Sequence, residues 1–349
     1  MSVLGVKGGS CEAFLAGSLS TLRRAEDGVF RRFVPLFAVA LISVACSSGG
    51  GASNGAASSP EASAVATGSF PVTVETDAGS VTLQKRPIAI VSLSPTATEM
   101  LFAIGAGPQV EAVDDQSNYP AEAPMTKLSG FTPNVEAITA YSPDLVVVSS
   151  DPGGLVRSLN QLDIPVLVQP PAATLDDSYS QISQLGQATG HATEAATLDE
   201  QMQSKIEQIV ASTPTPAVPL SLYHELDDTY YSATTKTFIG QIYSMFGLTN
   251  IADEAEKASS GYPQLSAEYI ISSDPDLILL ADVECCKQSA DTVGSRPGWS
   301  GIAAVKNGSV VALNGDVASR WGPRVVDFVQ TIADAVTAEQ GASKESPAA

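Results

Sequence analysis

Basic residues and histidine are scarce in this 349-residue chain. Its 18 lysines and arginines are outnumbered by 38 acidic residues, which gives a formal charge of -20, and it has only two histidines. A nucleic-acid-binding surface needs clustered basic side chains, so this class is excluded. The acidic surface favours solubility but does not by itself specify a partner. The hydrophobic content of 44% is enough for the cores of two domains.

The sequence also lacks the common catalytic signatures. It has no glycine-rich phosphate loop, no Gly-x-Ser-x-Gly elbow and no His-Glu-x-x-His. No metal-type spacing surrounds His191 or His224, and we predict no metal site and no cofactor. We expect His191 at a helix N-terminus and His224 as a hydrogen-bonded structural residue, with haem or metal ligation by His224 as the alternative. The protein is predicted not to be an enzyme.

The N-terminal region has the features of an export signal. Two arginines precede an apolar run at 33–45, which is too short to span a bilayer comfortably, so we predict a signal peptide over 1–45. The small residue before Cys46 resembles the lipobox of bacterial lipoproteins, which implies lipidation of Cys46 and anchoring to the outer face of the cytoplasmic membrane. Segment 46–69 is dominated by Ser, Gly and Ala, so we predict a flexible tether.

A long amphipathic helix is predicted near the middle of the chain. Leu198, Met202 and Ile206 recur at helical spacing with polar residues between them. The prolines from Pro214 onward prevent its continuation. We take 191–213 as a helix that connects two lobes.

The segments on either side of this helix follow one plan. Glu136 and Glu268 each stand seven positions before a Pro-Asp-Leu sequence, and each Pro-Asp-Leu leads into an aliphatic segment, 145–148 or 277–280. Unbroken aliphatic segments are typical of central parallel strands. We therefore predict an α/β protein with two Rossmann-like lobes. The predicted divisions after the tether are an N-terminal lobe at 70–190, the connecting helix, a C-terminal lobe at 214–339 and a disordered tail at 340–349.

Several residues at predicted strand ends are candidates for a ligand site, because ligands of open α/β sheets bind beyond the carboxyl ends of the strands. Ser94 follows a predicted buried strand and begins a helix. Aromatic residues fall in the other loops, where they suit a large, flat or apolar ligand, although ordinary loop packing explains any single one equally well. The candidate ligand-binding residues are Ser94, Tyr119, Phe131, Tyr231, Tyr262, Trp321 and Arg324.

Two further pairs of residues have more than one possible role. Glu136 and Glu268 lie in the first turns of predicted helices, where the helix dipole favours a carboxylate, or else they dock on basic groups of a partner. Cys285 and Cys286 are adjacent in a protein expected in an oxidising compartment. A strained vicinal disulfide, two thiols and an intermolecular link all remain open for this pair.

Taken as an ordered set, several motifs from about Phe70 to Ala338 resemble the substrate-binding lipoproteins of ABC importers for cobalamin, iron-siderophore and haem complexes. They are Arg86-Pro87, Ser94-Pro95-Thr-Ala-Thr-Glu99, Asn134-Val-Glu136, the two Pro-Asp-Leu strands, Arg296-Pro-Gly-Trp299 and Trp321-Gly-Pro-Arg324. The resemblance implies the class III periplasmic-binding-protein fold, with the ligand held between lobes that one rigid helix joins. It also implies that Glu136 and Glu268 meet arginines of the permease.

The resemblance leads to a functional expectation. Tyr119, Phe131, Tyr231 and Tyr262 match positions that are aromatic in vitamin B12-binding members, so we expect a monomeric receptor that binds a corrinoid and delivers it to ABC permease subunits. A ferric siderophore, with Arg320 and Arg324 as ligands, is the first alternative, and haem is the second. An exported enzyme and an extracellular ligand sensor are alternatives from other classes.

Overall fold

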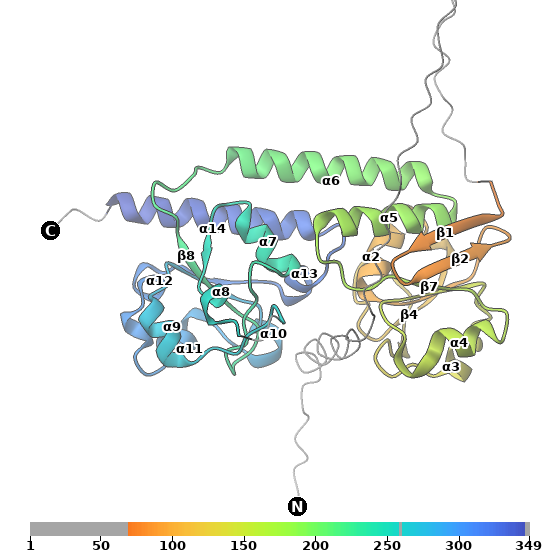
Figure 1. Ribbon diagram of the computed structural model, residues 1–349, viewed down its shortest axis with the longest axis horizontal. Helices are drawn as coiled ribbons and strands as arrows, with labels where there is room; N and C mark the ends of the chain where they lie inside the picture. The colour runs from red at the N-terminus through yellow and green to blue at the C-terminus, as the bar shows by residue number, and fades with distance from the viewer. Residues whose placement is uncertain (1–68, 258–259, 346–349) are drawn as a thin grey trace, which may run out of the picture.

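The computed structural model describes residues 69–257 and 260–345 and shows two α/β lobes side by side (Figure 1). Helix α6 (Ala192–Ser212) lies within the predicted connecting helix and runs along one side of both lobes. The predicted signal peptide, Cys46 and most of the tether lie outside the described residues. Within the described part, no helix is long and apolar enough to cross a membrane.

The N-terminal lobe contains a five-stranded parallel sheet with strand order β5-β4-β3-β6-β7. Its strands are β3 (Ile90–Leu93), β4 (Val110–Asp114), β5 (Met125–Leu128), β6 (Leu145–Val148) and β7 (Val166–Val168). An antiparallel pair, β1 (Val72–Thr76) and β2 (Gly79–Leu83), precedes this sheet. The helices of this lobe are α2 (Pro95–Ala103), α3 (Val135–Thr139), α4 (Leu155–Asn160) and α5 (Leu175–Thr189).

The C-terminal lobe contains a four-stranded parallel sheet with strand order β11-β10-β8-β9. Its strands are β8 (Ser221–Glu225), β9 (Thr249–Asn250), β10 (Leu277–Leu280) and β11 (Val310–Ala312). Its short helices are α7 (Phe238–Ser244), α8 (Ala252–Ala255), α9 (Ala267–Ser273), α10 (Val283–Cys286), α11 (Ala290–Gly294), α12 (Ala303–Asn307) and α13 (Gly315–Ser319). The last helix is α14 (Val325–Glu345).

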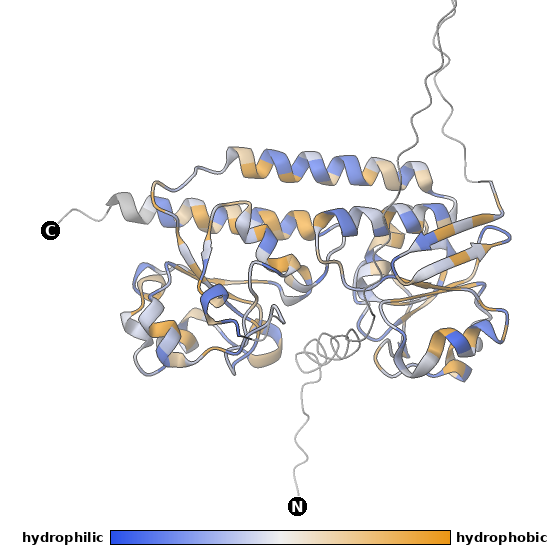
Figure 2. Ribbon diagram, in the orientation of Figure 1, coloured by the Kyte–Doolittle hydropathy of each residue, from blue (hydrophilic) through white to orange (hydrophobic). Residues whose placement is uncertain are grey.

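Helices α5 and α14 pack against α6. Met202, Ile206 and Ile209 of α6 are buried, and Figure 2 shows hydrophobic and hydrophilic residues alternating along both α6 and α14. Helix α14 ends at Glu345 and so extends into the predicted tail at 340–349.

The duplicated plan predicted from the Pro-Asp-Leu segments is confirmed. Strand β6 pairs with β3, and the corresponding β10 pairs with β8 in the same parallel sense. The aspartate of each segment also has the same role. Asp144 accepts hydrogen bonds from the amides of Ile88 (3.1 Å) and Ala89 (3.0 Å), and Asp276 accepts from the amide of Ser221 (2.8 Å). Each carboxylate therefore ties the start of one central strand to its neighbour.

We expect the substitution Asp276→Ala to lower the free energy of unfolding by about 1–3 kcal/mol, because it leaves the Ser221 amide and hydroxyl without their charged acceptor. Urea denaturation followed by circular dichroism measures the change. The control is Asp334→Ala, which removes an exposed carboxylate from α14. Equal effects of the two substitutions would contradict the role assigned to Asp276.

Candidate functional site

The topology of each sheet indicates where a ligand can bind. Chain connections run in opposite directions from β3, toward β4 on one side and β6 on the other, and the same reversal occurs between β9 and β10 around β8. In open α/β sheets the region beyond the carboxyl ends of the strands at such a reversal is the usual ligand site. The residues that follow β3, β4, β8 and β10 are therefore the candidates for ligand contact.

Beyond β3 and β4, a buried chain of hydroxyl groups fixes the loops of the N-terminal lobe. The hydroxyl of Thr98 donates to Ser92 (2.9 Å) and lies 3.0 Å from that of Ser117, which donates to Asp114 (2.6 Å). Burial raises the pKa of Asp114, and the hydrogen bond from Ser117 opposes this shift. All four residues are buried. This network rigidifies the loop that leads to Tyr119.

The second loop of this wall depends on a close backbone approach. A Cβ atom at Gly130 would lie 2.5 Å from the carbonyl oxygen of Leu93 and 2.9 Å from Asp114. Only glycine fits there without a shift of the backbone. Phe131, the next residue, is 54% exposed, and Tyr119 is 47% exposed. Two aromatic rings are thus held at the surface of the N-terminal lobe.

Glu99 of α2 accepts hydrogen bonds from two arginines of the other lobe. Its side chain is almost fully buried, with a residue exposure of 3%. Arg320 donates to Glu99 Oε1 (2.9 Å), and Arg324 donates through Nε to Oε2 (2.8 Å). This hydrogen bond is the first cause of the raised pKa of Arg324. A buried carboxylate between two guanidinium groups therefore joins the lobes.

The Nη1 and Nη2 groups of Arg320 make further hydrogen bonds. They bind the Asp316 carboxylate (2.7 Å), Asn118 Oδ1 (2.9 Å) and the Gln116 carbonyl (3.0 Å). Asn118 in turn donates to Asp316 (2.7 Å), which adds another bond between the lobes.

The guanidinium of Arg324 stacks on an aromatic ring. Its Cζ atom lies 4.3 Å from the centre of the Tyr119 ring, a cation–π geometry. We call Glu99, Tyr119, Asp316, Arg320 and Arg324 the interlobe cluster. It contains two positive and two negative side chains, so its formal charge is balanced.

A second ion pair lies at the ends of β8 and β10. Arg296 donates to both oxygens of the buried Glu225, at 2.7 and 2.6 Å. Its Cζ atom lies 4.5 Å from the centre of the Trp299 ring and 5.5 Å from that of Tyr230, which stacks on Trp299. Tyr230 has a φ of 69°, a rare value for an aromatic residue, and this stacking accompanies the strained backbone.

Asp282 is the most unusual group near this ion pair. It is fully buried, and neither carboxylate oxygen has a hydrogen-bond partner among the described residues. Burial, and secondarily the charge of Glu225, raises the pKa of Asp282 to about 8. Two carboxylates can only accept hydrogen bonds, so they can bind each other once one is protonated. The raised pKa of Asp282 favours its protonated form beside Glu225.

The predicted aromatic residues of the C-terminal lobe lie on two adjoining segments. Tyr231 forms an antiparallel bridge with Gln264, and the Ser232 amide donates to the Pro263 carbonyl (2.9 Å). Tyr231 is half-buried, as is Tyr262, which packs against the main core. The structure thus places these two tyrosines near each other. Contact of either residue with a ligand stays a prediction.

Two other predicted ligand residues have structural roles. Ser94 is buried, and its hydroxyl accepts a hydrogen bond from the Ala97 amide as the N-cap of α2, so its burial does not support ligand contact. The indole of Trp321 donates to Gln181 (2.7 Å), and its carbonyl accepts from Ser178. Trp321 therefore ties α5 to the segment that precedes α14.

The histidines behave as the sequence predicts. His191 is the N-cap residue of α6 and lies within hydrogen-bond distance of Arg86 and Gln109. His224 is fully buried, with Nδ1 2.6 Å from the hydroxyl of Tyr243. Burial lowers the pKa of His224 to about 3, so the ring is neutral. Because it faces the core, haem ligation by His224 is not supported.

The vicinal disulfide is not formed. The sulfur atoms of Cys285 and Cys286 lie 3.0 Å apart, compared with about 2.05 Å in a disulfide, and Cys286 is a free thiol. Both residues belong to the helical turn α10, where successive side chains point about 100° apart around the axis.

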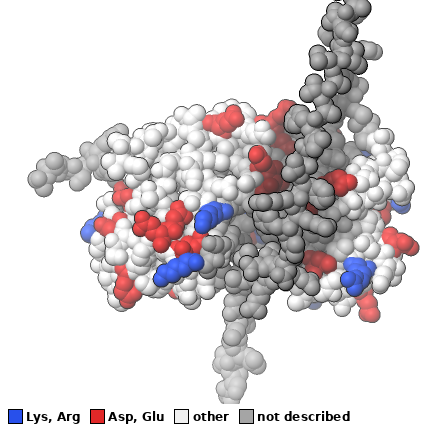
Figure 3. Space-filling view, viewed as in Figure 1, with Lys and Arg blue, Asp and Glu red and all other residues white. Residues whose placement is uncertain are grey.

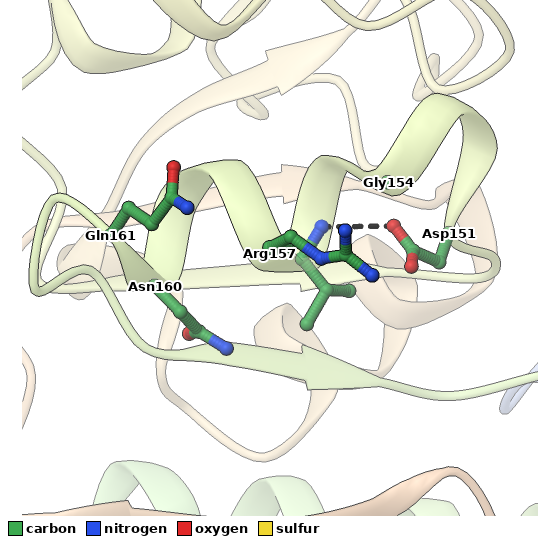
Figure 4. Close-up of a pocket in the computed structure, with 6 residues that line it drawn as sticks. Asp151, Gly154, Arg157, Asn160 and Gln161 are labelled. Carbon is green, nitrogen blue, oxygen red and sulfur yellow. Dashed lines mark hydrogen bonds between the residues drawn. The ribbon is translucent and has the colours of Figure 1, made fainter.

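One surface pocket lies along α4. It is lined by Asp151, Gly154, Val156, Arg157, Asn160 and Gln161 (Figure 4). These residues come from α4 and the turn before it, and none comes from the C-terminal lobe. The pocket is open and cannot bring the two lobes together around a ligand. The described residues also contain no group of three or more His, Cys, Asp or Glu side chains suited to a metal ion.

Our sequence analysis assigned no role to Glu99, Asp316 or Asp282. The sequence holds a signal for part of this set, because Asp316, Arg320 and Arg324 recur at intervals of four residues and so can share one helical face. Their acceptor in the other lobe is more than 200 positions away. No local pattern connects residues so far apart.

Comparisons with known proteins agree with this architecture. The periplasmic binding protein family matches residues 90–317. The chain is 31% identical to an uncharacterized ABC transporter substrate-binding lipoprotein of Bacillus subtilis, over 76% of this chain and 86% of the relative. It is 32% identical to a cobalamin-binding protein of Halobacterium salinarum, over 87% of this chain and 84% of the relative.

Solved structures are similar as well. The periplasmic vitamin B12-binding protein of Vibrio cholerae superposes with a TM-score of 0.58 at 25% identity, covering 74% of this chain and 98% of that chain. A periplasmic haem-binding protein from Roseiflexus has a TM-score of 0.64 at 23% identity, covering 73% of this chain and 100% of that chain. The fold is therefore shared by proteins that bind different ligands.

The protonated Asp282 predicts a pH-dependent stability. Its pKa is higher in the folded protein than in the unfolded chain, so folded molecules retain this proton as pH rises from about 4 to 8 while unfolded ones lose it. The contribution of Asp282 is most favourable below pH about 4, falls by up to about 1.4 kcal/mol per pH unit, and levels off above pH about 8.

The matched variant is Asp282→Asn, whose amide donates to Glu225 at every pH. We expect its stability relative to the native protein to increase from pH 5 to pH 8, as measured by urea denaturation at several pH values. A difference that does not change with pH would show that Asp282 is already ionised.

Proposed function

The chain belongs to the periplasmic binding protein family, and from this premise we propose that it captures a corrinoid such as cobalamin between its lobes. In this proposal the protein acts outside the cytoplasm and delivers the ligand to the transmembrane subunits of an ABC importer. Its role is binding and delivery, without bond chemistry. The names of the relatives support both parts, since they include a substrate-binding lipoprotein and a cobalamin-binding protein.

The observation that carries the corrinoid assignment is the combination of exposed rings and balanced charges between the lobes. Tyr119 and Phe131 offer aromatic surface, and the cationic side chain against Tyr119 is neutralised by Glu99. A large ligand with apolar faces and little net charge suits such a surface better than an anion does.

The rival ligands are less well supported. An anionic ferric siderophore would require Arg320 and Arg324 as ligands, but carboxylates and neighbouring oxygens already bind both Nη groups of Arg320 and the Nε and Nη2 groups of Arg324. A haem iron would require an accessible axial ligand. His224 cannot supply it because it is buried against Tyr243, which leaves an exposed tyrosine such as Tyr119 for this role.

The proposed docking surface contains Glu136 and Glu268. Each is exposed and lies in the first turn of its helix, α3 or α9, behind an asparagine or serine cap. Figure 1 shows α3 and α9 on the same side of the molecule, opposite α6. One permease surface could therefore meet both carboxylates, which supports docking in addition to their effect on the helix dipole.

We expect the protein to bind cyanocobalamin with micromolar or higher affinity in isothermal titration calorimetry. Tyr119→Ala should weaken binding about tenfold, because stacking on one ring contributes on the order of 1 kcal/mol. The control is Tyr141→Ala. Tyr141 is also exposed, but it precedes the amino end of β6, whereas ligands are expected beyond the carboxyl ends of the strands. Failure to bind cyanocobalamin, with a ferric siderophore or haem bound instead, would reject the corrinoid assignment.

The docking proposal is tested separately in cells. The double substitution Glu136→Gln and Glu268→Gln should reduce ligand uptake at least about tenfold while leaving the affinity of the purified protein unchanged, because charge pairs at an interface act on association. Glu194→Gln on α6 is the matched control, since its side chain is 57% exposed on the other side of the molecule. Normal uptake by the double variant at normal protein level would refute the docking role.

A further inference from the structure

We infer that Glu99 is a specificity-determining residue that keeps the ligand site closed to anions by neutralising Arg320 and Arg324. This role rests on the proposed function only in taking the region between the lobes as the ligand site. To the proposed function it adds a residue, Glu99, that does not itself touch the ligand. It also adds a class of ligand that the site rejects, namely anionic complexes.

The first step is burial. Glu99 is 3% exposed and Arg320 is 8% exposed, so both ends of this ion pair are largely withdrawn from water. Charges in such surroundings interact strongly because little solvent screens them. An arginine left without Glu99 would therefore exert a strong field on any nearby ligand.

The second step concerns which groups a ligand can reach. The Arg324 guanidinium is bound on one side by Glu99 and faces the ring of Tyr119, which is 47% exposed. The carboxylate bound to Arg320 belongs to Asp316, whose side chain is 39% exposed. The accessible groups of the interlobe cluster are thus an aromatic ring and a carboxylate.

The third step compares the charges. Arg320 and Arg324 contribute two positive charges, and Glu99 and Asp316 contribute two negative ones. Acidic side chains also predominate over basic ones on the face drawn in Figure 3. An anion that approaches this cluster meets no net attraction, and Asp316 repels it.

Removal of the Glu99 charge should reverse this selectivity. In Glu99→Gln the side chain keeps its shape and one carbonyl oxygen, which can still accept from Arg320. Its amide nitrogen cannot accept from Nε of Arg324, so this guanidinium keeps only the bond from Nη2 to the remaining oxygen, and its Nε donor becomes available to a ligand. The cluster then has a net positive charge.

The experiment compares two ferric complexes on the full chain. A ferric tricatecholate siderophore is trianionic, and a ferric trihydroxamate of similar size is uncharged. We expect Glu99→Gln to increase the affinity for the tricatecholate at least about tenfold, because a desolvated charge pair contributes about 1.4 kcal/mol or more. The affinity for the trihydroxamate and for cyanocobalamin should not increase.

Two variants serve as controls for charge. The double substitution Glu99→Gln and Arg324→Gln restores neutrality and should abolish the gain. Asp334→Asn removes an equal charge from the exposed side of α14 and should produce no gain. Higher ionic strength should reduce the gain of the single variant, because salt screens the attraction.

The results separate the role of Glu99 from the proposed ligand. If Glu99→Gln unfolds cooperatively but binds the tricatecholate no better, or binds both ferric complexes equally better, the role of Glu99 is refuted. If it fails to fold, Asp316→Asn provides the test, because it removes one negative charge from the interlobe cluster at an exposed partner of Arg320. Absence of any gain in that variant would also refute the role. A gain for the tricatecholate in a protein that never binds cyanocobalamin would support Glu99 and reject only the corrinoid.

Discussion

One buried carboxylate fixes the relation between the two lobes. Glu99 lies on α2 of the N-terminal lobe, and both arginines that bind it come from the segment between β11 and α14. A buried ion pair adds little net stability, because desolvation offsets its attraction, but removal of one partner costs about 3–5 kcal/mol. The pair therefore acts chiefly as a positional constraint. Since Trp321 in the same segment bonds to Gln181 of α5, the lobes are connected at this segment as well as through α6.

The two lobes share a topology but balance their charges differently. The aspartates of the Pro-Asp-Leu segments have the same bonds in both lobes, which is the clearest sign of the duplicated plan. Beyond the strand ends the lobes differ. At the junction a single carboxylate binds two arginines, whereas in the C-terminal lobe Arg296 binds Glu225, and Asp282, whose pKa is raised, lies beside it. In both places a positive charge near the ligand region is compensated by a buried acid.

Much of the fold could be predicted from the sequence because its strongest signals are local. Unbroken aliphatic segments identified β6 and β10, and the spacing of apolar residues identified α6. The edge strands β5 and β9 were not predicted, since they are short and only partly buried and so carry no clear period. The interlobe cluster was missed for a different reason. It depends on the packing of α2 against a segment more than 200 positions later, and no pattern along the chain records such a contact.

Strand alternation explains why position at a strand end is a weak guide to the site. Along β8, Leu222 and His224 face the main core and the Tyr243 ring, whereas Tyr223 and Glu225 face the side of Trp299 and Arg296. A shift of one position along the strand therefore leads from a buried structural histidine, His224, to an acid on the side of Arg296, Glu225. Ser94 shows the same effect at β3, where the helix that follows uses its hydroxyl as a cap. A ligand site in this fold consequently depends on which side each terminal residue faces, and in this chain the sides that face the junction carry rings and compensated charges.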